Sequence, residues 1–405
     1  MANTFTANTF NTNTKTELVA LRAAEVAGYL TVGSKSYCRD QLIGKRNGGQ
    51  AGKGKSYEFV IRDTGKFVEG PDLTGQINDV TERAVRLELY DGAVPVQTNL
   101  IEGVTDVEWD KEVAQPNGQK LINGIVKHFT ESDLGKQCTA FVGSGFVPLA
   151  KASAHLKSIA DENLYGFIDP MIQAVLASNG QQFVAVGAPE MYKSGLIGEF
   201  HGAEYRASRF MPAVSISDAL VSQIASATVT SYADDVSDPT LGTLTLSGVT
   251  EVVPAGTPIW IDGVYATDTV GDKTSAKRAF IAVADSANGA VKVRKVNFSG
   301  EGTKTLCDAN GKALQASDLA GKKVSCPEAG DYFTGIVRID GAMEFDTLDK
   351  LDTSNAETKT ASIGGVTVHE NRAIDNIRGQ NITRWDCVAL AGIVEDRGVA
   401  YVMVK

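Results

Sequence analysis

The stretches SYEFVIR (56–62) and AVRLELY (84–90) decide the fold of this 405-residue chain. Apolar and polar residues alternate in both, which is the period of a β-strand with one covered face. Turn signals fill the segment between them, so the pattern predicts a long β-hairpin that projects as an arm. Because a two-stranded hairpin is marginal in water, we expect its apolar stripe to lie against its own body or against another subunit.

A phosphate-loop match overlaps the start of this hairpin. Residues GQAGKGKS (49–56) fit the pattern G-x-x-x-x-G-K-[ST] of nucleotide-binding loops. Such a loop needs a buried strand before it and a helix after it, whereas here a polar segment precedes it and an alternating strand follows. We therefore expect a flexible hairpin base. The alternative, an α/β nucleotide-binding enzyme with an accessory β-sandwich, depends on this match and would be supported by ATP or GTP binding that is lost in Lys55→Ala.

Composition and charge exclude several classes of protein. The chain has 39 Lys and Arg against 49 Asp and Glu, a net charge of −10, so its field repels phosphate and disfavours sequence-independent nucleic-acid binding. The longest apolar run, CVALAGIV (387–394), is too short to cross a membrane. The first residues lack the pattern of a secretory signal, so we expect the protein to stay where it is made, which disfavours a bacterial adhesion protein.

Catalytic and metal-binding patterns are missing from the sequence. The four histidines are scattered, and no zinc spacing, G-x-S-x-G or H-E-x-x-H motif occurs. We expect no catalytic residue, no cofactor and no metal, and hence no enzyme. The five cysteines are expected to be free thiols in a reducing compartment, although Cys307 and Cys326 could also form a bridge within one small module.

Outward from the hairpin, the first half of the chain divides into three parts. Residues 1–31 are expected to form an arm and a short helix that begins at Thr16, and residues 32–100 the hairpin loop and peripheral strands. Residues 101–225 are expected to contain the first part of a body. Its expected elements are a long helix over 117–142, further helices over 150–164 and 170–177, and a strand over 183–186.

The second half is expected to begin with a β-rich insertion over residues 226–330. Short apolar runs there are separated by turn signals every eight to twelve residues, which is typical of a small sandwich or barrel. Its expected strands are 243–246, 258–261, 280–283, 291–296 and 322–325, and its expected core residues are Leu246, Ile259, Trp260 and Ile261. Acidic linkers at 234–239 and 327–331 would frame it. Residues 331–405 return to the body with strands at 335–339, 363–368, 387–393 and 399–404.

This order of elements resembles the major capsid (coat) protein of short-tailed double-stranded DNA bacteriophages, in the subgroup with an immunoglobulin-like (telokin-like) insertion domain. The segments that carry the resemblance are EGPDLT (69–74) with RLEL (86–89), YGFIDP (165–170), GEFHGAEYRASRFMPAV (198–214), TLTLS (243–247), AGTPIWIDGV (255–264) and CVAL (387–390). Two features depart from that family. The segment 231–242 is shorter, and Pro116-Asn117-Gly118 would interrupt the long helix.

The resemblance implies an α+β tailed-phage major capsid fold with an extended β-hairpin arm, a long spine helix, an α/β axial body and an inserted all-β domain. It implies self-assembly into pentamers and hexamers of an icosahedral head, with a scaffolding protein and a portal as partners. The shell would enclose DNA without sequence-specific binding, in a virion made in the host cytoplasm. Rim charges on the hairpin would contact a neighbouring subunit: Arg62, Lys66, Glu69 and Asp72.

Overall fold

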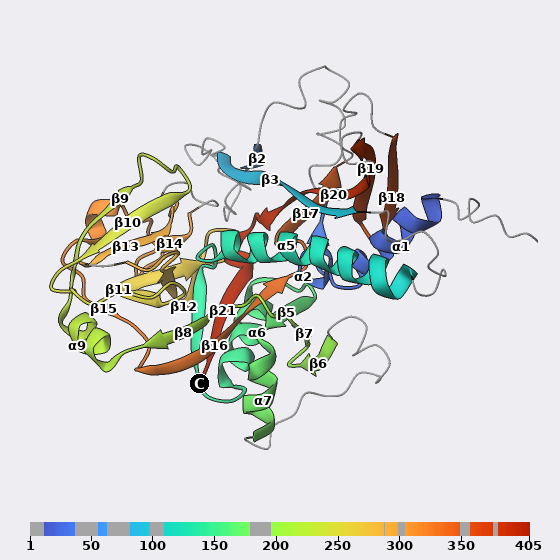
Figure 1. Cartoon of the computed structure of the whole chain (residues 1–405). Helices are drawn as coiled ribbons and strands as arrows, with labels where there is room; N and C mark the ends of the chain where they lie inside the picture. Colours follow the sequence, from blue (N-terminus) through green and yellow to red (C-terminus); the bar gives the residue numbers. More distant parts are fainter. Residues whose placement is uncertain are drawn as a thin grey trace, which may run out of the picture.

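The computed structural model describes residues 12–36, 56–62, 82–97, 109–178, 196–286, 288–298, 304–348, 357–375 and 380–405. These residues form a mixed α+β protein, so the predicted class is confirmed. The long helix α5 crosses the middle of the molecule (Figure 1). Strands β9 to β15 gather at the left of this view, β17 to β20 at the upper right, and helices α6 and α7 below.

The N-terminal segment consists of two helices and a short strand, α1 (Thr12–Ala24), α2 (Gly28–Thr31) and β1 (Ser34–Lys35). The prediction that a helix begins at Thr16 is wrong, because α1 starts four residues earlier. Thr16 is buried inside α1, where its hydroxyl donates to the carboxylate of Glu370. Residues 1–11 of the expected arm lie outside the described residues.

The predicted hairpin strands are confirmed as an antiparallel pair, β2 (Ser56–Arg62) and β3 (Glu82–Gln97). Ser56 begins β2, so a strand follows the phosphate-loop match, as the rejection of that motif requires. The residues between the two strands and those of the match before Ser56 lie outside the described part of the chain.

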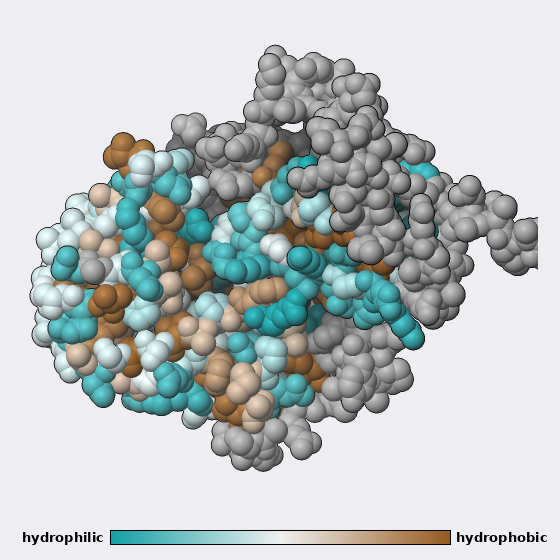
Figure 2. Space-filling model, in the orientation of Figure 1, coloured by the Kyte–Doolittle hydropathy of each residue, from teal (hydrophilic) through white to brown (hydrophobic). Residues whose placement is uncertain are grey.

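The predicted long helix is present but displaced toward the N-terminus. A π-helical turn, η2 (Asp110–Ala114), leads directly into α5 (Gln115–Asp133). Pro116 lies in the first turn of α5, where proline is tolerated, so the expected interruption does not occur. The prediction that the helix continues to Val142 is wrong, because Leu134 leaves the helical conformation and Gly135 takes a φ of 85°. The outward face of α5 is hydrophilic (Figure 2).

A seven-stranded sheet forms the body, in the order β4-β21-β16-β5-β7-β6, with β8 also paired to β16. Helix α7 confirms the prediction over 170–177, whereas α6 ends at Ile159 and Leu164 belongs to a strand. The expected strand over 183–186 lies outside the described residues. The elements are β4 (Thr139–Gly143), α6 (Val147–Ile159), β5 (Leu164–Ile168), α7 (Pro170–Ser178), β6 (Leu196–Phe200), β7 (Ala203–Ala207), β8 (Ala213–Ile216), β16 (Gly330–Ile339) and β21 (Val399–Val404).

Strands β9 to β15, which we call the module, form a three-stranded sheet (β13-β10-β9) and a four-stranded sheet around β11. They follow helix α9 (Asp218–Ser226). The expected linker at 234–239 is wrong in its first residue, because Asp234 lies in β9 and pairs with Gly242. The elements are β9 (Val229–Asp234), β10 (Leu241–Leu246), β11 (Pro258–Thr267), β12 (Lys273–Ile281), β13 (Ala290–Arg294), β14 (Leu306–Cys307), η3 (Ala316–Leu319) and β15 (Val324–Ser325).

The second large sheet has the order β1-β17-β20-β19-β18. Strand β3 also pairs with β20, in addition to β17 and β19. The expected single strand over 363–368 is wrong, because Gly364 and Gly365 form a two-residue turn between β18 and β19. Both glycines have positive φ (58° and 81°), which a type I′ hairpin turn requires. The elements are β17 (Met343–Leu348), β18 (Glu357–Ile363), β19 (Val366–Asp375), β20 (Gln380–Ile393) and η4 (Asp396–Gly398).

Candidate functional site

Strand β3 is part of both the hairpin with β2 and the large sheet that contains β20. Its residues 89–97 pair with β20 inside the large sheet, whereas residues 82–88 pair with β2 alone. We call residues 56–88, that is β2, residues 82–88 of β3 and the segment that connects them in the sequence, the tongue. The tongue therefore continues a strand that is anchored in a sheet, which gives a narrow β-ribbon a rigid base.

Near its base, the apolar stripe of the tongue is covered by its own chain. Leu87 is buried against Leu390 and Val394, and Val85 and Leu89 pack around this small cluster while remaining partly exposed. In the register of the hairpin, position 57 lies opposite Leu87 and position 59 opposite Val85, and the sequence of β2 has the same alternating pattern as that of β3. We expected the apolar stripe to lie against the body or another subunit, and at Leu87 it lies against the body of its own chain.

The structure places the predicted contact residues as follows. Arg62 ends β2, opposite Glu82, while Lys66, Glu69 and Asp72 lie outside the described residues.

Of the four residues predicted for the core of the module, three are buried and one is not. Leu246, Ile259 and Ile261 are buried, whereas Trp260 is half-buried. Successive residues of a strand point to opposite faces, so Trp260 lies on the other side of β11 from the two isoleucines. It packs against the edge of the core rather than at its centre.

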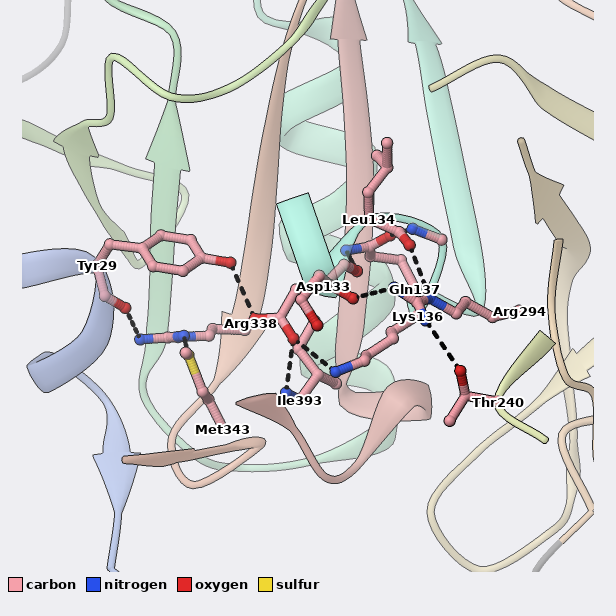
Figure 3. Close-up of polar contacts among 12 residues, drawn as sticks. Tyr29, Asp133, Leu134, Lys136, Gln137, Thr240, Arg294, Arg338, Met343 and Ile393 are labelled. Carbon is pink, nitrogen blue, oxygen red and sulfur yellow. Dashed lines mark hydrogen bonds and ion pairs between the residues drawn. The ribbon is translucent and has the colours of Figure 1, made fainter. Parts of the chain in front are cut away.

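A buried polar junction lies where α5 ends (Figure 3). Asp133, the last residue of α5, is 1% exposed and accepts three hydrogen bonds. The donors are the Tyr29 hydroxyl at 3.2 Å, the Lys136 Nζ at 2.9 Å and the backbone N–H of Ile393 at 3.1 Å. One carboxylate thereby joins α2, the end of α5 and the end of β20, and its burial is offset by an ammonium partner and two further donors.

Arg338 extends this junction to the N-terminal segment. It is fully buried in β16, and its guanidinium donates to the carbonyl oxygens of Tyr29 at 2.8 Å and Val32 at 2.6 Å and contacts the Met343 sulfur. The guanidinium also lies 4.6 Å from the ring centroid of Phe167. Burial lowers the pKa of Arg338 to about 10, so it stays cationic at neutral pH, and burial raises the pKa of Tyr29 well above its usual value. The N-terminal segment is thus fixed to β16 by a cation that is bound by carbonyl dipoles.

The module is attached to the same end of α5. We call residues 132–138, the last two residues of α5 and the five that follow them, the joint. Arg294 of β13 donates to the carbonyl oxygen of Leu134 at 3.2 Å and to that of Ser132, and Arg278 of β12 donates to the Gln137 carbonyl at 3.2 Å. The carbonyls of Ser132 and Leu134 lie at the C-terminal end of α5, the negative end of the helix dipole, where a cation is favoured. Arg294 therefore satisfies carbonyl groups at the end of α5, and Arg278 binds a carbonyl group of the segment that follows the helix.

The tongue reaches the joint through Gly392. A Cβ placed on this glycine would lie 2.7 Å from Cδ2 of Leu87, 3.2 Å from Nζ of Lys136 and 3.5 Å from Oδ1 of Asp133. A methyl group does not fit in that space, so Leu87 rests directly on the backbone of β20 beside the Asp133–Lys136 pair. The tongue base, the N-terminal segment and the module thus converge on seven residues.

Sequence reasoning missed this junction, although two signals were present. Asp133 follows Phe129 by four residues and so continues the buried stripe of α5, where a carboxylate is unusual. Arg338 interrupts the apolar run GIVRI at 335–339. A charged residue at a core position predicts a buried polar contact, but Tyr29, which contacts both Asp133 and Arg338, is more than 100 residues away from each in sequence.

Outside the junction, the described His and Cys side chains do not form clusters. No group of three or more His, Cys, Asp or Glu side chains that could bind a metal occurs among them, and Cys307 and Cys326 are both free thiols. His155 of α6 is 7% exposed, and neither ring nitrogen has a hydrogen-bond partner. Burial lowers the pKa of His155 to about 4, so the ring is neutral at physiological pH. No described helix combines the length and the apolar character needed to span a bilayer.

Comparison with known proteins gave no match to a family model and no match among curated sequences. Solved structures to which the chain is similar include that titled "Mycobacterium phage Che8", at 10% identity over 92% of this chain and 89% of that one, with a TM-score of 0.39. The capsid of Ralstonia phage GP4 is 7% identical over 87% and 84% of the two chains, with a TM-score of 0.40. A virus-like particle from Pyrococcus furiosus is 8% identical over 90% and 96%, with a TM-score of 0.33.

Proposed function

We propose that this chain is the major structural subunit of an icosahedral phage head, with the tailed-phage major capsid fold, and that it assembles by laying its tongue on a neighbouring copy. The observation that carries the proposal is the tongue itself. It is anchored in a sheet, its stripe is covered by its own chain at Leu87, and the same alternating pattern continues past that point onto β2.

The rest of the chain has the properties that a shell subunit needs. A shell forms from weak contacts repeated many times, so its subunit requires a rigid body and an arm that overlaps a neighbour rather than a reaction pocket. The body here is rigid, because two large sheets, α5 and the module meet at one hydrogen-bonded junction. Pentamers and hexamers around double-stranded DNA, a scaffolding protein, a portal and a virion location follow from the resemblance in the sequence.

The net charge fits the enclosure of DNA without tight binding. A surface with an excess of ten negative charges does not hold phosphate, so the packaged genome would stay free of the inner wall. The proposed contacts of Arg62, Lys66, Glu69 and Asp72 would then set the register between subunits rather than the affinity.

The proposal is tested by expressing the full chain with its scaffold supplied and measuring particle size by light scattering and negative-stain microscopy. We expect shells, sheets or capsomers from the natural chain. A variant in which Asn-Gly replaces residues 63–81 keeps β2 and β3 joined by a short hairpin turn and should fold but remain unassembled. A chain that stays monomeric at high concentration, or a shortened variant that still forms shells, would contradict the proposal.

A further inference from the structure

We infer that the joint is a mechanical coupler through which the module fixes the direction of the tongue, and that Arg294 and Asp133 are its positioning residues. This inference deepens the proposed function, since it assigns to the module a role in presenting the assembly arm. It depends on contacts at the two ends of one short segment.

The first contact is between the module and the joint. Arg294 binds the carbonyl oxygens of Ser132 and Leu134, so it fixes the peptide group directly before Asp133 and the one that follows Leu134. Gly135, with a φ of 85°, brings the joint close to the module: a Cβ there would lie 2.6 Å from Cγ1 of Val283 and 3.2 Å from Cγ of Arg294. The joint therefore follows the position of β13.

The second contact is between the joint and the tongue. Asp133 accepts the backbone N–H of Ile393 at 3.1 Å, which holds the last residues of β20 in place. Leu87 lies directly on the preceding residue, Gly392. A shift of Asp133 therefore shifts the surface on which the tongue base rests.

The hydrogen bonds of Asp133 hold the two contacts in a fixed arrangement. Asp133 is buried with three hydrogen-bond donors, and Lys136 is an ion-pair partner within the joint itself. Removal of one partner from such a group leaves an incompletely satisfied buried charge, so the network acts as a unit. Coupling free energies between sites of about 1–3 kcal/mol correspond to changes of about 5-fold to 150-fold.

The test is amide hydrogen–deuterium exchange on the unassembled full chain, so that it does not depend on shell formation. We expect Arg294→Gln to raise exchange of the amides in 82–90 and 387–394 by about fivefold or more, with β16 and β21 unchanged. The matched control is Lys292→Gln. Lys292 also lies on β13, but its ammonium group forms an ion pair with Asp235 of the module, so the tongue should exchange as in the natural chain.

Two further variants separate coupling from a general loss of stability. Arg294→Lys keeps the charge but not the two-carbonyl geometry and should show a smaller rise in the same amides, and it replaces Arg294→Gln if that variant does not fold. Asp133→Asn should raise the exchange of the same amides. In the double variant with Arg294→Gln, the rise in exchange should be smaller than the sum of the two single effects. Unchanged tongue exchange in Arg294→Gln and Arg294→Lys, a rise equal to that of Lys292→Gln, or a uniform rise across all strands would overturn the inference. Loss of shells with normal tongue exchange would count against the joint and leave the proposed function intact.

Discussion

The tongue and the module are built from strands of the same alternating pattern, but they bury it differently. In the module, Leu244 and Val291 pair across neighbouring strands and both are fully buried, as are Ile259 and Ile261. Among the tongue residues whose side chains the structure describes, Leu87 is buried and Val85 is partly exposed. Two stacked sheets supply both walls of a core, whereas a ribbon supplies one. The module is therefore complete within one chain, while the tongue is covered at Leu87 by Leu390 and Val394.

The largest expected effect contrasts equivalent truncations in the two regions. Ile261→Ala removes methyl groups from a closed core and should lower the free energy of unfolding by about 2–5 kcal/mol. Val85→Ala in the tongue should lower it by about 1 kcal/mol or less, because Val85 is only partly covered. Urea denaturation of the unassembled chain measures both, and equal losses would show that the tongue is packed as completely as the module.

The next effect is a pH dependence of the free energy of unfolding that comes from a residue of the body and not from the tongue. His155 in the body has a pKa lowered to about 4 by burial, against about 6.5 in the unfolded chain. The unfolded chain binds the proton first, so this contribution is full above about pH 6.5 and is lost as the pH falls toward 4. The loss amounts to about 3 kcal/mol.

The measurement is the free energy of unfolding at several pH values between 4 and 7. His155→Leu should remove most of the slope in this range, while Val85→Ala should leave it unchanged. A slope that persists in His155→Leu would show that another group causes it.

A smaller effect sharpens the contrast at the base of the tongue. Gly392→Ala places a methyl group 2.7 Å from Leu87 and should cost about 1–3 kcal/mol in unfolding free energy. Leu87→Ala in the same chain removes the clash, so the double variant should lose less than the sum of the single ones.

The matched control for that glycine is Gly124→Ala. No atom outside the helix lies within 4 Å of a Cβ at Gly124, so alanine there should raise stability by about 0.5–1 kcal/mol. Additive losses for Gly392→Ala and Leu87→Ala would contradict direct contact between the two residues.

The smallest expected effect lies on the outward face of α5. Lys127 and Glu131 form an i,i+4 ion pair at 3.8 Å, and both side chains are more than half exposed. Lys127→Ala should change the free energy of unfolding by only about 0.3–0.5 kcal/mol and leave assembly intact. Loss of shells in this variant would show that the hydrophilic face of α5 is an interface, which the tongue-based account does not include.

The sequence predicted those elements whose signal is local. The tongue strands, α7 and most module strands have a clear period and turn residues at their ends, and they form near the expected positions. The end of α5 was misplaced, because Phe141 and Val142 continue the helical spacing although they belong to β4. Asp234 was assigned to a linker because acidic pairs are common there, but its backbone pairs with Gly242. The junction could not be derived, since Asp133 and Arg338 reveal only that a partner exists and not which residue provides it.

The most direct test of the account uses the tongue's own lysine, Lys66. Equal amounts of ¹⁵N-labelled and unlabelled chain are mixed before assembly, the particles are cross-linked at lysine, and the peptides that contain Lys66 are identified by mass spectrometry. The account predicts cross-links from Lys66 that join one labelled and one unlabelled peptide, because the tongue lies on another copy. Cross-links from Lys66 that always join peptides of the same label would place the tongue on its own chain and contradict the account.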